Sequence, residues 1–156
     1  MKKFVLAICL FLTGIASSTA VCDSKFYLRS EFGPNVQNVE VCSKRDDVIR
    51  VVKQLHYATA NGDVAKLKKL TTPEFYKKQY HLSDESLRKE LLSVPYEKRQ
   101  NLIKHIDEYS EFTVLFSNAG DYATVWADDT VTGKSIRFGL IYDFDAERWL
   151  ICDYEY

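Results

Sequence analysis

The chain has 156 residues, of which 28% are charged and 13% aromatic. This length allows one domain, and the composition excludes a disordered chain and indicates a packed core. The 21 basic residues nearly balance the 22 acidic residues, and no basic stripe runs along the sequence. We therefore expect neither nucleic acid nor an anionic membrane surface as a partner.

The first 20 residues have the pattern of a secretory signal peptide. Lys2 and Lys3 precede an apolar run from residue 4 to residue 15, and the small residues Ser18-Thr19-Ala20 follow. The run is too short to span a bilayer, so a signal peptide is favoured over a membrane anchor. No later run is apolar and long enough to replace it. The sequence predicts cleavage after Ala20, a periplasmic or secreted protein, and no membrane span.

Three cysteines remain after this cleavage, namely Cys22, Cys42 and Cys152. Lipid attachment at Cys22 is disfavoured, because Val21 and Thr19 occupy positions where a small and an aliphatic residue are usual. Exported proteins meet oxidising conditions, which favour a disulfide. Sequence alone leaves all three pairings open.

Residues 21–43 form a cysteine-flanked N-terminal extension with the pattern of a hairpin. Residues 25–32 alternate between apolar and polar side chains, Gly33-Pro34-Asn35 is typical of a turn, and valines follow at alternating spacing. Such a hairpin brings Cys22 and Cys42 towards its open end, which favours a bond between them worth roughly 3 kcal/mol. Cys152 would then be a small buried residue without a partner. Lipidation of Cys22 would instead leave Cys42–Cys152.

Residues 44–156 are expected to form a single α+β domain that begins with helices. Apolar residues recur with helical spacing between Asp46 and Ala60, and Asn61-Gly62 ends this helix. Asp63, Thr72 and Ser83 are each placed to cap a following helix, and a last helix begins after Ser93 and Pro95. The mostly charged positions between residues 83 and 108 indicate a solvent-exposed surface.

The second half of this domain predicts four consecutive strands. Apolar and polar residues alternate in four short segments that are separated by turn residues, with segments at 112–117, 122–127, 136–143 and 149–154. Short connections require an antiparallel meander. Gly139 inside the third strand suggests a bulge or a bend. Both faces carry apolar groups, so one would be covered by helices and the other by the N-terminal hairpin or by another copy of the protein.

The order of these elements resembles the nuclear-transport-factor-2-like superfamily of cystatin-like α+β cones, in particular its small exported bacterial members. The resemblance lies in Ala60-Asn61-Gly62-Asp63, Thr71-Thr72-Pro73-Glu74-Phe75 and Trp149-Leu150-Ile151, and it covers residues 44–156. It implies helices packed on a curved four-stranded sheet, with a pocket at the hollow end of the cone. The N-terminal extension and the long helical stretch at 83–108 depart from the common pattern.

A pocket inside such a cone would be lined by aromatic groups and one histidine. The candidate ligand-binding residues are His56, Tyr57, Phe75, Tyr76, Trp126, Phe138 and Tyr142. This set fits an apolar ligand or a side chain of a protein partner. The main hypothesis is a non-catalytic binding module, such as an immunity or accessory protein, which could also form a homodimer through the exposed sheet face.

The alternative hypothesis is a small hydro-lyase or isomerase. Some members of the resembled superfamily, such as ketosteroid isomerase and scytalone dehydratase, use an Asp, Tyr or His inside the cone. The corresponding candidates here are His56, Tyr57, Tyr76, Tyr80, Asp128, Arg137, Tyr142 and Asp153. None of them forms a recognised pair at a fixed spacing. The scattered histidines and cysteines do not suggest a zinc site, and no cofactor is expected.

The N-terminal assignment predicts a specific mature chain. Intact mass spectrometry under non-reducing conditions should give the mass of residues 21–156 without lipid and with one free thiol. A retained N-terminus, or a lipid-sized increase in mass, would contradict the assignment.

Overall fold

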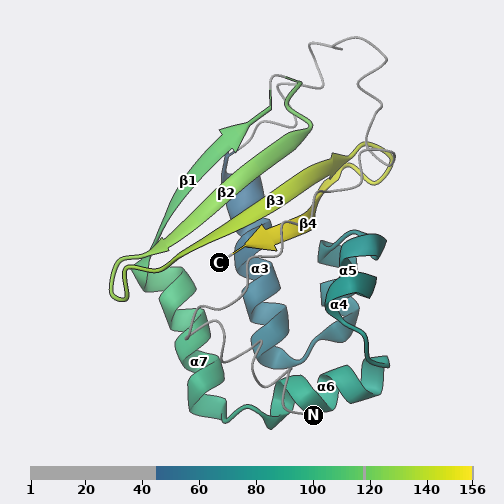
Figure 1. Ribbon diagram of the computed structural model, residues 1–156, viewed down its shortest axis with the longest axis vertical. Helices are drawn as coiled ribbons and strands as arrows, with labels where there is room; N and C mark the ends of the chain where they lie inside the picture. Colours follow the sequence, from purple (N-terminus) through teal and green to yellow (C-terminus); the bar gives the residue numbers. More distant parts are fainter. Residues whose placement is uncertain (1–44, 118, 156) are drawn as a thin grey trace.

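The computed structural model describes residues 45–117 and 119–155, and it confirms the α+β fold (Figure 1). Helices come first and strands second. The elements are α3 (Arg45–Asn61), α4 (Val64–Leu70), α5 (Pro73–Gln79), α6 (Asp84–Ser93), α7 (Tyr96–Lys104), the π-helical turn η3 (His105–Tyr109), β1 (Ser110–Phe116), β2 (Tyr122–Asp129), β3 (Ser135–Asp143) and β4 (Arg148–Glu155). The signal peptide and the N-terminal extension lie outside the described residues. None of the helices in the described ranges is long and apolar enough to cross a membrane.

Side-chain caps define the starts of three helices where the sequence predicts them. Asp63 Oδ1 accepts the Lys66 N–H at 3.0 Å at the start of α4. Thr72 Oγ1 caps α5, and Ser83 Oγ caps α6, in the same way. Each cap satisfies an N–H group that has no partner within its own helix. The start of α7 differs, because Ser93 ends α6 and Pro95 precedes α7 without a side-chain hydrogen bond.

The four strands form an antiparallel meander in the order β1-β2-β3-β4, as expected. The described helices lie on one side of this sheet (Figure 1). β4 is an edge strand, but the chain between α4 and α5 covers part of that edge. The Thr72 N–H donates to Ile151 O at 2.9 Å, and Thr71 pairs with Ile151.

The main core lies between α3 and the inner face of the sheet. Val48, Val52 and Leu55 on α3 pack in one cluster with Val125 and Phe138 from the central strands. The spacing of these helix residues is the i, i+4, i+7 stripe that the sequence shows. This packing fixes α3 across the sheet, and the shorter helices pack around it.

Gly139 lies beside a register shift in the β3–β4 pairing, which confirms the irregularity predicted at this position. A Cβ atom here would lie only 2.6 Å from the Tyr122 hydroxyl and 3.2 Å from Asp153 Cβ. The lack of a side chain at Gly139 therefore allows the Tyr122 hydroxyl to lie close to the strand backbone.

Cys152 is buried on β4 and is disulfide-bonded. The interpretation of Cys152 as a thiol without a partner is therefore wrong. The expected Cys22–Cys42 pairing lies outside the described residues.

Phe138 should behave as a core residue. Its side chain is only 1% exposed, so Phe138→Ala should lower the free energy of unfolding by about 3–5 kcal/mol. Leu115→Ala, at a strand position that is 59% exposed, should change it by less than about 0.5 kcal/mol. Urea denaturation of both variants measures the difference, and equal effects would contradict this assignment of the core.

Candidate functional site

A cavity of about 310 Å³ lies where α3, α7 and η3 meet the ends of β2 and β3. In Figure 1, α7 lies beside α3, and the turn between β2 and β3 lies next to the C-terminal end of α7. Two hydrogen bonds hold this turn in place, because both the N–H and the hydroxyl of Thr130 donate to Tyr109 O. The cavity is therefore framed by elements that are far apart in the sequence.

The inner wall of the cavity is mainly apolar. Its lining includes Ala60, Leu91, Val94, Leu102, Ile106, Ala127 and Ile136. Ala60 and Ala127 are short side chains from the facing layers, so the helix and the sheet do not fill the space between them. A volume of this size is at the lower end of the range for small-molecule sites.

His56 is the buried polar group of the cavity wall. Its side chain is 2% exposed, and Nδ1 lies 2.9 Å from Val52 O, one turn earlier on α3. Because a carbonyl can only accept, Nδ1–H is the donor and Nε2 is left as an acceptor. Burial is the largest influence on this ring and lowers its pKa to about 4, although the Val52 carbonyl and the charge of Asp107 oppose the shift. His56 is therefore neutral near pH 7.

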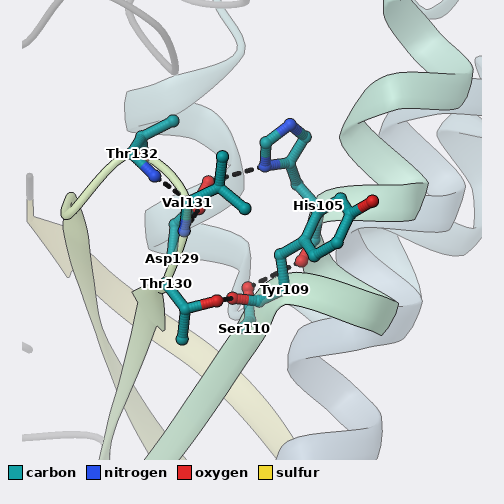
Figure 2. A network of polar contacts seen from close by, with 7 residues as sticks. All are labelled: His105, Tyr109, Ser110, Asp129, Thr130, Val131 and Thr132. Atoms are coloured by element: carbon teal, nitrogen blue, oxygen red, sulfur yellow. Dashed lines mark hydrogen bonds and ion pairs between the residues drawn. The ribbon is translucent and has the colours of Figure 1, made fainter.

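A histidine–aspartate pair lies at the rim of the same cavity (Figure 2). His105 Nδ1 is 2.7 Å from Asp129 Oδ2, and both residues line the cavity. Asp129 Oδ1 accepts the N–H groups of Val131 and Thr132 at 2.8 and 2.9 Å. The turn thus fixes the carboxylate, and the carboxylate orients the imidazole so that Nε2 points away from Asp129.

The surroundings of Asp129 favour its charged form. Burial alone would raise the pKa of this carboxyl. The N–H groups of Thr132 and Val131, together with His105, outweigh that effect, and they hold the pKa below its ordinary value. With Asp129 ionised, Nδ1–H of His105 is the donor in this contact, and Nε2 lies on the far side of the ring from the carboxylate. The pair therefore has the arrangement that a general base requires.

Basic side chains complete the rim. Lys98, Arg99 and Lys134 line the cavity, and Asp129 is the one acidic residue among the described lining residues. Arg99 has a structural role as well. Its Nη1 donates to Ala60 O at 2.7 Å and its Nε to Val94 O at 3.0 Å. Arg99 thereby joins the end of α3 to the start of α7 and supports one wall of the cavity.

The structure does not bring the seven candidate ligand-binding residues together. His56 lines the cavity, whereas Phe75 and Phe138 lie in the main core. Tyr57 lies in a separate hollow on α3, where its hydroxyl donates to Asp107. Burial, followed by the Asp107 contact, raises the pKa of Tyr57 to about 12.

The remaining three candidates lie elsewhere on the fold. Tyr76 packs against Tyr80, with ring centroids 5.0 Å apart. Tyr142 stacks edge-on against Trp149 and lines a different cavity near the β3–β4 turn. Trp126 is half-buried, and it alternates with the core residues of β2, so it faces away from the helices.

Sequence reasoning missed the pair that the structure forms at the rim. His105 and Asp129 are 24 residues apart, and no motif connects them. The one available signal was Asp129 at the start of a turn rich in polar residues, but this is also the usual position of a structural aspartate. Among the described residues, no group of three or more His, Cys, Asp or Glu side chains could hold a metal ion.

The burial of His56 predicts a specific pH dependence of stability. The ring takes up a proton near pH 6.5 in the unfolded chain but only near pH 4 in the folded one. The unfolded chain therefore binds more protons between these values, so the free energy of unfolding should fall as the pH drops from 6.5 to 4. The loss from this group is about 3 kcal/mol in total.

Urea denaturation between pH 4 and 7 measures this dependence. The His56→Gln variant should lack the fall in the free energy of unfolding that protonation of His56 causes. The His81→Gln variant, changed at an exposed position, should retain this fall. The same pH dependence in the wild type and in His56→Gln would contradict the assignment.

Comparison with known proteins gives no relative for this chain. No family model matches it, no curated protein matches it, and no solved structure matches it. The resemblance to the nuclear-transport-factor-2-like superfamily therefore stays an expectation that rests on the order of elements in the sequence.

Proposed function

We propose that this protein is an exported, non-catalytic binding protein for a small apolar molecule, which it holds in the cavity between α3, α7 and the sheet. The observation that carries the proposal is the cavity itself, with its largely apolar wall and a few polar groups at one side. Sites of this composition bind small organic ligands through apolar contact and orient them through the polar groups.

The charges at the rim favour a ligand with an acidic group. Lys98 and Lys134 are exposed basic residues that line the cavity. Asp129, the acidic lining residue, already accepts three hydrogen bonds from His105, Val131 and Thr132. Lys98 therefore offers positive charge at the rim to an anionic group, while the wall accepts the apolar part of the same molecule.

Export supports the same function. The signal-peptide pattern of residues 1–20 and the disulfide-bonded Cys152 both fit an oxidising compartment such as the periplasm or the exterior. A binding protein in such a compartment would capture its ligand outside the cytoplasm. In a second form of the proposal the ligand is the side chain of a protein partner, as for an immunity or accessory protein.

The second candidate function is catalysis of proton transfer by a hydro-lyase or isomerase. One observation favours it, namely the 2.7 Å contact of His105 with Asp129 at the rim of an apolar cavity. Nε2 of His105 would take a proton from a bound substrate, and Asp129 would stabilise the resulting imidazolium. His105 replaces the candidates that the sequence suggests for this role, of which Tyr142 and Asp128 do not line this cavity.

The binding proposal is tested with two dyes that differ by one sulfonate group. The neutral dye N-phenylnaphthylamine should bind with a stoichiometry of one, and anilinonaphthalene sulfonate should bind more tightly. Lys98→Gln should reduce that preference by about two- to fivefold, since an exposed charge contributes less than about 1 kcal/mol. Fluorescence titration at two salt concentrations measures both affinities.

A matched pair of variants locates the binding site. Leu102→Trp should fill the cavity and abolish binding of both dyes, whereas Leu115→Trp, on the outer strand surface, should leave binding unchanged. Circular dichroism checks that both variants are folded. Undiminished binding to a folded Leu102→Trp protein would place the site elsewhere.

The catalytic alternative is tested with nitrobenzisoxazole, an apolar compound whose ring opens when a base removes its carbon-bound proton. If the alternative holds, the protein accelerates this reaction, His105→Gln abolishes the acceleration, and His81→Gln retains it. Asp129→Asn should lower the rate about tenfold or more, because the imidazole loses its orienting charge. A rate equal to that of buffer would count against catalysis at this site.

A further inference from the structure

A second, smaller apolar cluster lies on the face of the sheet that points away from the helices. Ile141, Leu150 and Cys152 are buried there, with Tyr122 packed against them, and this cluster is separate from the main core. Their strand neighbours Leu140, Trp149 and Ile151 face the helices instead. The β3–β4 half of the sheet therefore has buried apolar groups on both sides.

Part of this cluster borders described residues at the β4 edge, where Ile141 and Leu150 line a hollow with Thr71 and Pro73. The described helices lie on the opposite side of the sheet (Figure 1). Side chains beside a residue on the same sheet face shield only its flanks and leave its outer end exposed to solvent. Yet Ile141 is only 4% exposed. On the same face, Leu115 of β1 is 59% exposed, so the low exposure belongs to the β3–β4 half of this face.

Cys152 points to the part of the chain that would cover the cluster. It is one of the three buried residues of the cluster, and it is disulfide-bonded. All other cysteines of the chain, Cys9, Cys22 and Cys42, precede Arg45. We propose that residues 21–44, the N-terminal extension together with Lys44, pack over the outer face of β3 and β4 and are joined to it through a bond between Cys152 and Cys22 or Cys42.

The length and pattern of this segment suit the position. Arg45 Nη2 donates to Phe112 O at 2.7 Å, so the segment joins the described chain on the β1 side. Crossing from β1 to β4 takes three strand spacings, about 14 Å, whereas 24 extended residues reach up to roughly 80 Å.

The segment also offers an apolar side to the sheet. In the sequence, Phe26, Leu28 and Phe32 alternate with Lys25, Tyr27, Arg29 and Glu31, so an extended strand would carry the first three on one side. The apolar side can contact the cluster while the charged side stays in water. Such a cover would leave the β3–β4 face closed to a second copy of the protein.

Non-reducing proteolysis with mass spectrometry tests the connection on the mature chain. The expected result is a disulfide-linked peptide that joins Cys152 to Cys22 or Cys42, with the remaining cysteine open to alkylation. A bond between Cys22 and Cys42, with Cys152 alkylated, would overturn the proposal.

Hydrogen exchange tests whether the extension packs on the outer sheet face or is attached to it through the disulfide alone. Leu28→Asp should increase the exchange rates of the backbone amides of Ile141 and Leu150 about tenfold, since it removes apolar contact from the cluster. The neighbouring Arg29→Asp variant should leave these rates unchanged. Equal rates in both variants and the wild type, together with a dimer in analytical ultracentrifugation, would assign the cover to a second copy and overturn the proposal.

Discussion

The packing of α3 against the inner face of the sheet is the constraint on which the other features depend. Val48, Val52 and Leu55 form one apolar stripe, and the central strands offer a matching apolar surface. Burial of these side chains positions the helix across the strands. The cavity begins where this packing ends, because the last turns of α3 and the end of β2 carry the short residues Ala60 and Ala127.

The rim depends on the core through a short series of contacts. Arg99 holds the start of α7 against the end of α3, which places η3 and His105 over the cavity. The β2–β3 turn is fixed from the other side by Thr130 and by the N–H groups that bind Asp129. His105 and Asp129 are therefore each held in place by fixed contacts. A pair of polar groups held in this way suits either the orientation of a ligand or the transfer of a proton.

The two faces of the sheet have different roles in this arrangement. The inner face carries the core and the cavity, and all residues that line the cavity belong to elements on that side or at its rim. The outer face carries the cluster around Cys152. Closure of that face by the N-terminal extension would connect the stability of the fold to disulfide formation after export, while ligand binding on the inner side would not require the bond.

The sequence by itself determined the order and type of the elements, because helical spacing, capping residues and strand alternation act over a few neighbouring residues. The caps at Asp63, Thr72 and Ser83 and the irregularity at Gly139 are of this local kind. Only the tertiary structure decided which side chains share a space. His105 and Asp129 meet because a π-helical turn and a strand end converge, whereas Phe75 and Phe138 are buried in the main core. An aromatic residue on a strand gives the same sequence pattern whether it fills a core or lines a cavity, so the distinction requires the partner layer.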